Sequence, residues 1–234
     1  MNDHETSIRP LEPRQSLRET VTERLRAAII SGEMSEGEMY SAPGLAAQLG
    51  VSATPVREAM VDLSAEGMVE SVKNRGYRVT VVSDAELDEL AQLRAMIEAP
   101  AVRQVAEAGP LAEPVQRELA GHADDIVTAA RAGDLTGYLG ADRAFHALLL
   151  EQFGNRQLVH LATALRSRTR MYGLRNLADE QLVASALEHQ QLLDLIQADE
   201  PAAAEDLLRR HIGHARGLWA GTAAAPTGAD AANG

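Results

Sequence analysis

The sequence predicts a mostly α-helical protein in which a small helical domain with a β-hairpin precedes an all-α, six-helix antiparallel bundle. Three observations predict this fold class. Apolar residues recur every three to four positions in successive segments of the chain. The pattern changes to simple alternation only within residues 68–82. Short turn signals built on Gly, Asn, Asp and Pro separate the helical segments that follow.

Length and composition limit the class of protein. The chain has 234 residues, of which 45% are hydrophobic and none is cysteine, and its net charge is −12. This length allows one large or two modest domains with buried cores. The lack of cysteine excludes a disulfide framework, a cysteine-based zinc finger and a thiol nucleophile. Because no apolar run reaches membrane length and residues 1–13 contain no apolar leader, we expect a cytoplasmic protein without a membrane partner.

The small domain is predicted to begin with three helices. The first covers 17–30, where Ser16 is the expected N-cap and apolar residues repeat every four positions. A short second helix covers 43–49 and stops at Gly50. The third begins at hydroxyl residues, either of which can cap it. These candidate caps are Ser52 and Thr54, and the buried stripe behind them is Val56, Met60 and Leu63.

Two short strands follow these helices, over 68–72 and 77–82, and the turn 73–76 joins them. This turn carries Lys73 and Arg75 and no acidic residue. Two helices joined by a tight turn and followed by such a hairpin are typical of a winged helix-turn-helix, whose second helix enters the major groove. The sequence therefore predicts double-stranded DNA as a partner.

The rest of the chain divides into the six helices of the bundle. They are predicted over 84–108, 111–132, 134–153, 156–174, 178–198 and 201–219. The predicted domains are a disordered arm at 1–14, the winged helix-turn-helix at 15–82, the bundle at 83–219 and a disordered tail at 220–234.

Four polar residues are predicted to lie inside the bundle. Helical spacing places Asp142 and His146 on the apolar face of the third bundle helix, His189 in the stripe of the fifth and His211 in that of the sixth, while His160 points away. A carboxylate in an apolar stripe is costly unless it is paired or bound to a cation. Three imidazoles and one carboxylate suit zinc first, with nickel, manganese and iron as alternatives. Hydrogen-bonded core histidines without a metal are the competing interpretation.

Arg94 also needs a partner, because it lies at the margin of the apolar stripe of the first bundle helix. One interpretation is an ordinary ion pair with Glu98 at i+4. The other is a clamp for a small carboxylate metabolite beside the metal. Thr169 and Tyr172, on the inward face of the fourth bundle helix, are the expected hydrogen-bond donors to that ligand.

The N-terminal segments closely resemble the winged helix of GntR-family transcriptional regulators. The matching segments are LAAQLGVS (45–52), TPVREA (54–59), LSAEGMV (63–69) and RGY (75–77). The resemblance implies that Arg57 and Gly76 contact the operator. The expected DNA-binding residues are Ser52, Thr54, Pro55, Arg57, Lys73, Arg75 and Gly76. The family commonly has arginines where this chain has Ala53 and Pro43-Gly44, so the operator is expected to differ from that of arginine-bearing relatives.

The bundle is similar to the ligand domain called FCD in the FadR subgroup of that family. The matching motifs are Asp-x₃-His at 142–146, Glu-His at 188–189 and Arg-His-Ile at 210–212. Six helices fit the VanR-like branch of the subgroup. The resemblance implies a metal bound by Asp142, His146, His189 and His211, and an organic acid as effector. In that context Arg94, within Leu93-Arg94-x₃-Glu98, is the residue expected to bind the acid.

These patterns predict a one-component transcriptional regulator, with repression as the favoured direction, and not an enzyme. A homodimer is expected to place two winged helices on a pseudo-palindromic operator. Binding of the metal and the acid to the bundle would shift the relative placement of the two winged helices. One alternative is a direct metal sensor without an organic effector. Another is a metallo-hydrolase, against which the sequence has no His-Glu-x-x-His and no further acid placed as general base.

The negative charge lies mainly in the predicted bundle. Residues 1–82 have nine basic and twelve acidic side chains, a net charge of −3, while the remainder carries −9. The hairpin turn is the basic part of the DNA-binding domain. We therefore expect few phosphate contacts and a shallow salt dependence of DNA binding.

Overall fold

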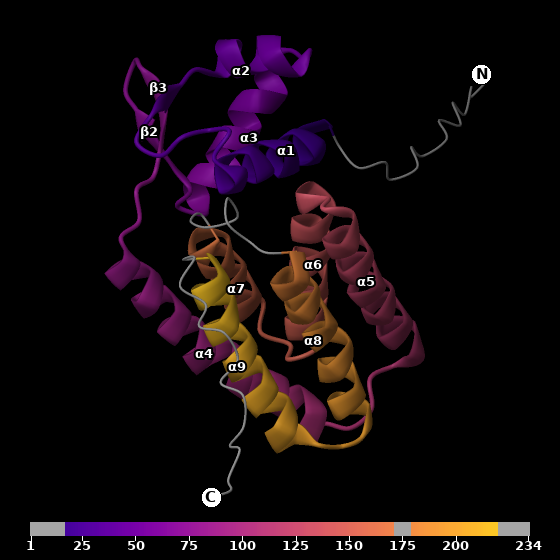
Figure 1. Cartoon of the computed structure of the whole chain (residues 1–234). Coiled ribbons are helices and arrows are strands. Elements are labelled where there is room, and N and C mark those ends of the chain that lie inside the picture. Colours follow the sequence, from indigo (N-terminus) through magenta and orange to yellow (C-terminus); the bar gives the residue numbers. More distant parts are fainter. Residues whose placement is uncertain (1–16, 171–178, 220–234) are drawn as a thin grey trace, which may run out of the picture.

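The computed structural model describes residues 17–170 and 179–219, with side chains in the last helix described as far as residue 213. Helices dominate this part of the chain (Figure 1). The N-terminal elements are α1 (Leu17–Ser31), β1 (Met39–Tyr40), α2 (Ala42–Leu49), α3 (Ala53–Ala65), β2 (Val69–Val72) and β3 (Gly76–Val79). The bundle elements are α4 (Asp84–Glu107), α5 (Glu113–Ala132), α6 (Leu135–Glu151), α7 (Arg156–Thr169), α8 (Asp179–Gln197) and α9 (Pro201–Trp219). Neither Ser16 nor the arm and tail predicted at the two ends lies among the described residues.

Local sequence explains where the helices of the small domain begin and end. Ser41 Oγ accepts a hydrogen bond from the amide of Gly44 at 3.1 Å and so caps α2, which ends at Gly50 with a φ of +67°. Ser52 is the N-cap residue of α3, but its side chain makes no capping hydrogen bond. That hydroxyl is therefore available on the surface. The predicted stripe of α3 is confirmed as core, because Val56, Met60 and Leu63 are fully buried.

The hairpin belongs to a three-stranded antiparallel sheet with the order β1-β3-β2. The first strand was not predicted, because two residues are too few to show alternation. Met39 pairs with Arg78, and Val69 pairs with Val79 on the other side of β3. The two predicted strands are confirmed, although both are shorter than expected. The sheet thus holds the turn 73–75 at its free end.

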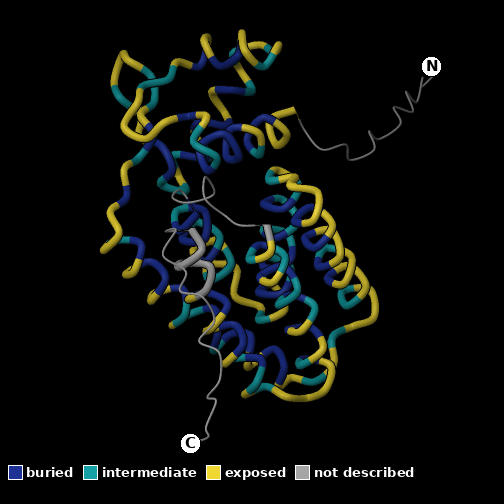
Figure 2. Tube along the Cα trace, viewed as in Figure 1, coloured by how far each residue is buried: buried dark blue, intermediate teal, exposed yellow. Residues whose placement is uncertain are grey.

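The six predicted helices of the bundle are confirmed. Gly133 ends α5 with a φ of +66°, and Asp134 then caps α6 by accepting from the amide of Gly137. The fourth bundle helix, α7, ends at Thr169 rather than at 174, and residues 171–178 lie outside the described part. Buried residues line the interior of both regions, while exposed residues cover their outer faces (Figure 2).

The two regions meet at α1 and at the ends of α3 and α7. In Figure 1, α1 lies between the bundle and the rest of the small domain, and it contacts α6. Within the bundle α4 packs against α7 and α9, and α5 packs against α6 and α8. None of the described helices combines the length and apolarity needed to cross a membrane.

Candidate metal centre and nucleic-acid interface

Four polar side chains converge inside the bundle. Asp142 and His146 lie one turn apart on α6, and α8 and α9 bring His189 and His211 to them. One potential ligand atom from each residue lies within 4.8 Å of the others. All four residues are buried, with exposed fractions of 3% or less. The structure thus brings together the residues that helical spacing placed on three inward faces.

Hydrogen bonds on the outer edge of two imidazole rings fix their orientation. His189 Nδ1 lies 3.0 Å from the carbonyl oxygen of Ala186, and His211 Nδ1 lies 2.6 Å from Glu188 Oε2. Because carbonyl and carboxylate oxygens only accept, each Nδ1 donates, which directs the Nε2 of each ring toward the interior of the bundle. Metal-ligating histidines are typically held by such partners.

The inner atoms of these side chains face one another. His146 Nε2 lies 3.0 Å from His189 Nε2, and Asp142 Oδ1 lies 3.3 Å from that same nitrogen. His211 Nε2 is buried and has no hydrogen-bond partner within the described part of the chain. Electron-pair donors therefore point into one small space, where a divalent cation would satisfy them together. The donor set fits zinc, nickel, manganese or iron.

Burial and charge set the protonation of these groups. Burial, reinforced by Arg166, lowers the pKa of His146 well below its ordinary value, and burial lowers the pKa of His211 to about 4. Burial alone would raise the pKa of Asp142, but Arg166 and Arg170 outweigh it and hold that pKa well below its usual range. At neutral pH these two imidazoles are therefore neutral and the carboxylate is ionised, which are the forms that bind metal ions.

Two buried arginines that sequence reasoning missed hold the carboxylate of Asp142. Arg166 Nε lies 3.0 Å from Asp142 Oδ2, and Arg170 Nη2 lies 2.5 Å from Oδ1. Arg166 Nη1 also lies 3.2 Å from Glu98 Oε2. The sequence held a signal for Arg166, which precedes Thr169 by three residues and so shares its inward face. Arg170 follows Arg166 by four residues within the helix predicted over 156–174, but its pairing with Asp142 on α6 leaves no signal in that pattern.

Arg94 is buried, with an exposed fraction of 2%, although the sequence pattern places it at the margin of the apolar stripe. The reason is that α7 covers the side of α4 that the pattern of α4 leaves open. Arg94 Nε lies 2.6 Å from Glu98 Oε1, which is the i+4 ion pair of the first interpretation. Its Nη1 also donates to Thr169 Oγ1 at 3.1 Å. Two residues expected to bind the effector are thus neighbours, and the third, Tyr172, lies outside the described residues.

Among the described residues of this cluster, buried guanidinium groups outnumber buried carboxylates. Three buried guanidiniums, those of Arg94, Arg166 and Arg170, face two buried carboxylates, those of Glu98 and Asp142. Arg166 Nη2 is buried and lacks a hydrogen-bond partner among the described residues. A buried cation with too few acceptors favours an anionic ligand, and guanidinium pairs well with carboxylate. The arrangement can therefore take up a small organic acid beside the four converging side chains.

The residues expected to contact DNA lie on the small domain. The exposed ones are Ser52, Thr54, Arg57, Lys73 and Arg75. Pro55 and Gly76 are half-buried. The first three exposed residues share the N-terminal part of α3, and the two basic ones share the turn between β2 and β3. The structure thus presents a helix start and a basic turn as exposed surfaces.

Gly76 has a structural reason to be glycine. Its φ is +116°, and a Cβ at this position would meet the carbonyl oxygen of Tyr40 on β1. Glycine at this position therefore allows the close approach of the neighbouring strand β1, a strand that sequence reasoning had missed.

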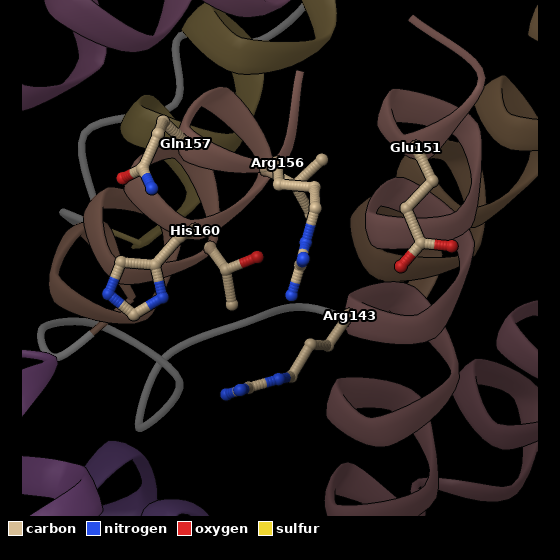
Figure 3. Close-up of a pocket in the computed structure, with 7 residues that line it drawn as sticks. Arg143, Glu151, Arg156, Gln157 and His160 are labelled. Atoms are coloured by element: carbon tan, nitrogen blue, oxygen red, sulfur yellow. The ribbon is translucent and has the colours of Figure 1, made fainter. Parts of the chain in front are cut away.

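A surface groove of about 700 Å³ lies between α6 and α7 (Figure 3). Arg143 and Glu151 extend into it from α6, and Arg156, Gln157 and His160 extend from α7. His160 is exposed, as its position off the apolar stripe predicted. The four converging residues are not part of its lining, so the groove and the buried centre are separate features.

Comparison with protein families decides the class of the protein. Residues 17–79 match the gntR family of bacterial regulatory proteins, and residues 89–214 match the FCD domain. The chain belongs to the GntR family. This GntR protein with an FCD domain is a DNA-binding transcriptional regulator and not an enzyme, which answers the hydrolase alternative. The FadR subgroup and its VanR-like branch stay predictions.

Individual GntR relatives agree with this assignment. The "Probable D-xylose utilization operon transcriptional repressor" of Paenarthrobacter nicotinovorans is 30% identical over 200 residues, which cover 83% of this chain and 87% of that protein. The solved structure of E. coli McbR/YncC has a TM-score of 0.69 and 23% identity and covers 85% of this chain and 94% of its own. A metal-free FCD domain of TM0439 has a TM-score of 0.50 and 18% identity and covers 61% of this chain and 96% of its own. Both structural likenesses show the fold alone.

Proposed function

We propose that this GntR regulator binds a divalent metal and a small organic acid in its bundle, and that these ligands control operator binding by the winged helix-turn-helix. The proposed division is a DNA-binding domain at 15–82 and an effector and dimerisation domain at 83–219. Repression is the proposed direction, and the name of the Paenarthrobacter relative as a repressor supports it.

The observation that carries the metal part is the convergence of four potential ligand atoms in a buried space. Asp142, His146, His189 and His211 would hold the ion. The most direct sign of it is that His211 Nε2 has no hydrogen-bond partner among the described residues. Zinc is the first choice for three imidazoles and one carboxylate. The description of the TM0439 FCD domain as metal-free agrees with this proposal. When bound, the ion supplies a positive charge that draws an anionic ligand to the centre.

The excess of buried guanidinium groups carries the acid part. Arg94 and Arg166 are the proposed carboxylate partners, and Thr169 and Tyr172 are the proposed hydrogen-bond donors. Arg94 already touches Thr169, so one carboxylate can contact both side chains. Three buried guanidiniums face the buried carboxylates of Glu98 and Asp142, and a carboxylate ligand would pair with the third guanidinium.

At the other end of the molecule, the operator is the proposed partner of α3 and the hairpin turn. Ser52, Thr54, Pro55 and Arg57 would enter the major groove, and Lys73, Arg75 and Gly76 would follow the phosphate backbone. A homodimer would present two such surfaces to a pseudo-palindromic operator, as GntR regulators typically act as dimers.

The test uses full-length protein loaded with zinc and an operator selected from random DNA by the wild type. A panel of small carboxylates is titrated while the dissociation constant for this operator is measured. We expect at least one acid to weaken binding about fivefold or more. Arg94→Gln should lose this response and keep its zinc, and His160→Gln should keep both.

Two results would contradict parts of this account. A wild type that responds to zinc but to no acid in the panel would favour the direct metal sensor. A wild type that binds no zinc would remove the metal centre, and with it the function proposed for the bundle.

A further inference from the structure

A second charged centre lies where the small domain meets the bundle, around the carboxylate of Glu66. This residue caps the C-terminal end of α3, the helix proposed to read DNA. Arg26 on α1 donates to it through Nη2 at 2.6 Å and Nε at 3.2 Å. The side chain of Glu66 is only 11% exposed. Within its own domain, Glu66 therefore ties the end of α3 to α1.

Two residues of the bundle hold the same carboxylate. Arg143 on α6 places Nη1 3.2 Å from both carboxylate oxygens of Glu66. Ser167 on α7 donates its hydroxyl to Oε2 at 2.6 Å. One side chain at the end of α3 thus joins three helices, two of which belong to the bundle.

The bundle residues that hold Glu66 are sequence neighbours of those that form the metal centre. Arg143 follows Asp142, and Ser167 follows Arg166. Asp142 and Arg166 are themselves paired at 3.0 Å. On both α6 and α7, one residue therefore contacts the buried centre while the next contacts Glu66. The peptide plane between two neighbouring residues is rigid, so a small displacement of α6 or α7 would move both the residue at the buried centre and the residue that contacts Glu66.

Electrostatics keeps Glu66 charged at this position. Burial tends to raise the pKa of Glu66, but Arg26 and Arg143 outweigh it and lower that pKa below its ordinary value. The ends of the helices are also in close contact here. Arg168 pairs with Glu86 near the start of α4, and a Cβ on Gly67 would lie 2.9 Å from Arg168 Cδ. The C-terminal end of α7 is thus packed against both regions.

We propose that Glu66 is the residue through which the buried centre controls the position of α3, an inference that rests on the metal site proposed above. A cation at the centre shares Asp142 with Arg166, and any adjustment of this pair moves the backbone that carries Arg143 and Ser167. Their hold on Glu66 passes the adjustment to the end of α3. By linkage, removing the charge of Glu66 also changes zinc affinity at a site that Glu66 does not touch.

The test compares zinc-loaded with metal-free full-length protein, using the selected operator, and measures the ratio of the two dissociation constants. In the wild type we expect a ratio that differs from one by about fivefold or more. In Glu66→Gln, which keeps the size of the side chain, the ratio should fall to within about twofold of one. Ser167→Ala, a milder change made from the bundle side, should reduce the ratio in the same direction.

Asp62→Asn is the matched control, because Asp62 lies on the same helix and pairs only with Arg18 of the same domain among the ion pairs of the described residues. It should keep the wild-type ratio. Zinc affinity, measured by competition with a chelator, is the second readout and should change in Glu66→Gln but not in Asp62→Asn. If Glu66→Gln and Ser167→Ala both bind zinc and keep the wild-type ratio, the coupling role of Glu66 is wrong and the metal site stands. The same conclusion follows if the wild type binds zinc and its operator affinity does not change. If the wild type binds no zinc, the metal site and the coupling role are both wrong.

Discussion

His211 illustrates at the scale of one residue how a metal ligand is prepared by its surroundings. Its Nδ1 is held by Glu188 at 2.6 Å, and its Nε2 is buried with no partner among the described residues. The carboxylate fixes the tautomer and makes the ring a better electron-pair donor. Burial at the same time keeps the ring neutral. Orientation and charge state therefore both favour a cation at Nε2.

The first prediction concerns the partner of His211. Glu188→Gln should lower zinc affinity about 10- to 100-fold, because an amide oxygen is a weaker acceptor for the Nδ1 proton than a carboxylate. A competition titration with a chelator measures this affinity. Glu118→Gln is the control, since Glu118 faces His122 at 4.0 Å on the surface. Equal zinc affinities in the two variants would contradict the role given to Glu188.

The second prediction concerns pH and the metal-free protein. The pKa of His211 is about 4 in the fold and about 6.5 in the unfolded chain, so the unfolded chain binds the extra proton between these values. The stabilisation is therefore complete above pH 6.5 and is lost as the pH falls towards 4. By pH 5 this imidazole should cost about 2 kcal/mol of unfolding free energy. Urea unfolding should show a smaller loss for His211→Gln than for the wild type, and an equal loss would contradict the prediction.

The candidate site was predictable where each residue lies on the apolar stripe of its own helix. This is why Asp142, His189 and the other two ligand candidates were found from spacing alone. Contacts between helices leave no such periodic trace. Arg170 was missed for this reason, and Arg94 was placed at a margin that another helix covers.

At the scale of elements, long periodic segments predicted the helices well. Residues such as Gly133, which ends α5, and Asn155, the N-cap of α7, marked the turns between them. The two-residue strand β1 was not predictable, because it exists only through its pairing with β3. The end of α7 was placed too late, since the inward pattern continues through Thr169 without a stop signal. β1, the strand that was not predicted, also explains the structural role of Gly76, because Tyr40 of β1 lies against this glycine.

The third prediction tests that role. Gly76→Ala should destabilise the small domain by about 1–3 kcal/mol, because it combines a positive φ with a Cβ directed at the carbonyl of Tyr40. Operator affinity should fall with it. Gly121→Ala in α5 is the control, since a Cβ there would meet nothing within 4 Å apart from its chain neighbours and the nearby backbone of its own helix, and it should be neutral or stabilising by up to about 1 kcal/mol. Urea unfolding compares the two, and equal stabilities would show that the hairpin accepts the extra carbon.

For the whole molecule, most of the negative charge lies in the bundle and little of it in the DNA-binding domain. The net charge of −12 first suggests that DNA is a poor partner, but the family assignment shows that the protein is a DNA-binding regulator. The segment up to residue 82 carries only −3, and Lys73 and Arg75 are exposed on its hairpin turn. Affinity should therefore depend on a few local contacts and on dimerisation more than on overall attraction.

The fourth prediction follows from this charge distribution. Lys73→Ala should reduce the slope of log affinity against log salt concentration by about 1, because one phosphate contact is removed. Binding to all sequences should weaken by a similar factor. Arg117→Ala is the control, as Arg117 is exposed on α5 and pairs with Glu113 in the bundle. A slope unchanged in Lys73→Ala would show that the hairpin turn does not contact phosphate.

The central claim is that the buried centre binds one metal ion per chain, and zinc stoichiometry in the native mass spectrum tests it most directly. The full-length wild type should carry one zinc per chain, His189→Ala should carry none, and His160→Ala should carry one. His189→Ala removes a buried ligand candidate, while His160→Ala changes an exposed histidine of the same bundle. A wild type without zinc, or a His189→Ala variant that retains it, would contradict the account.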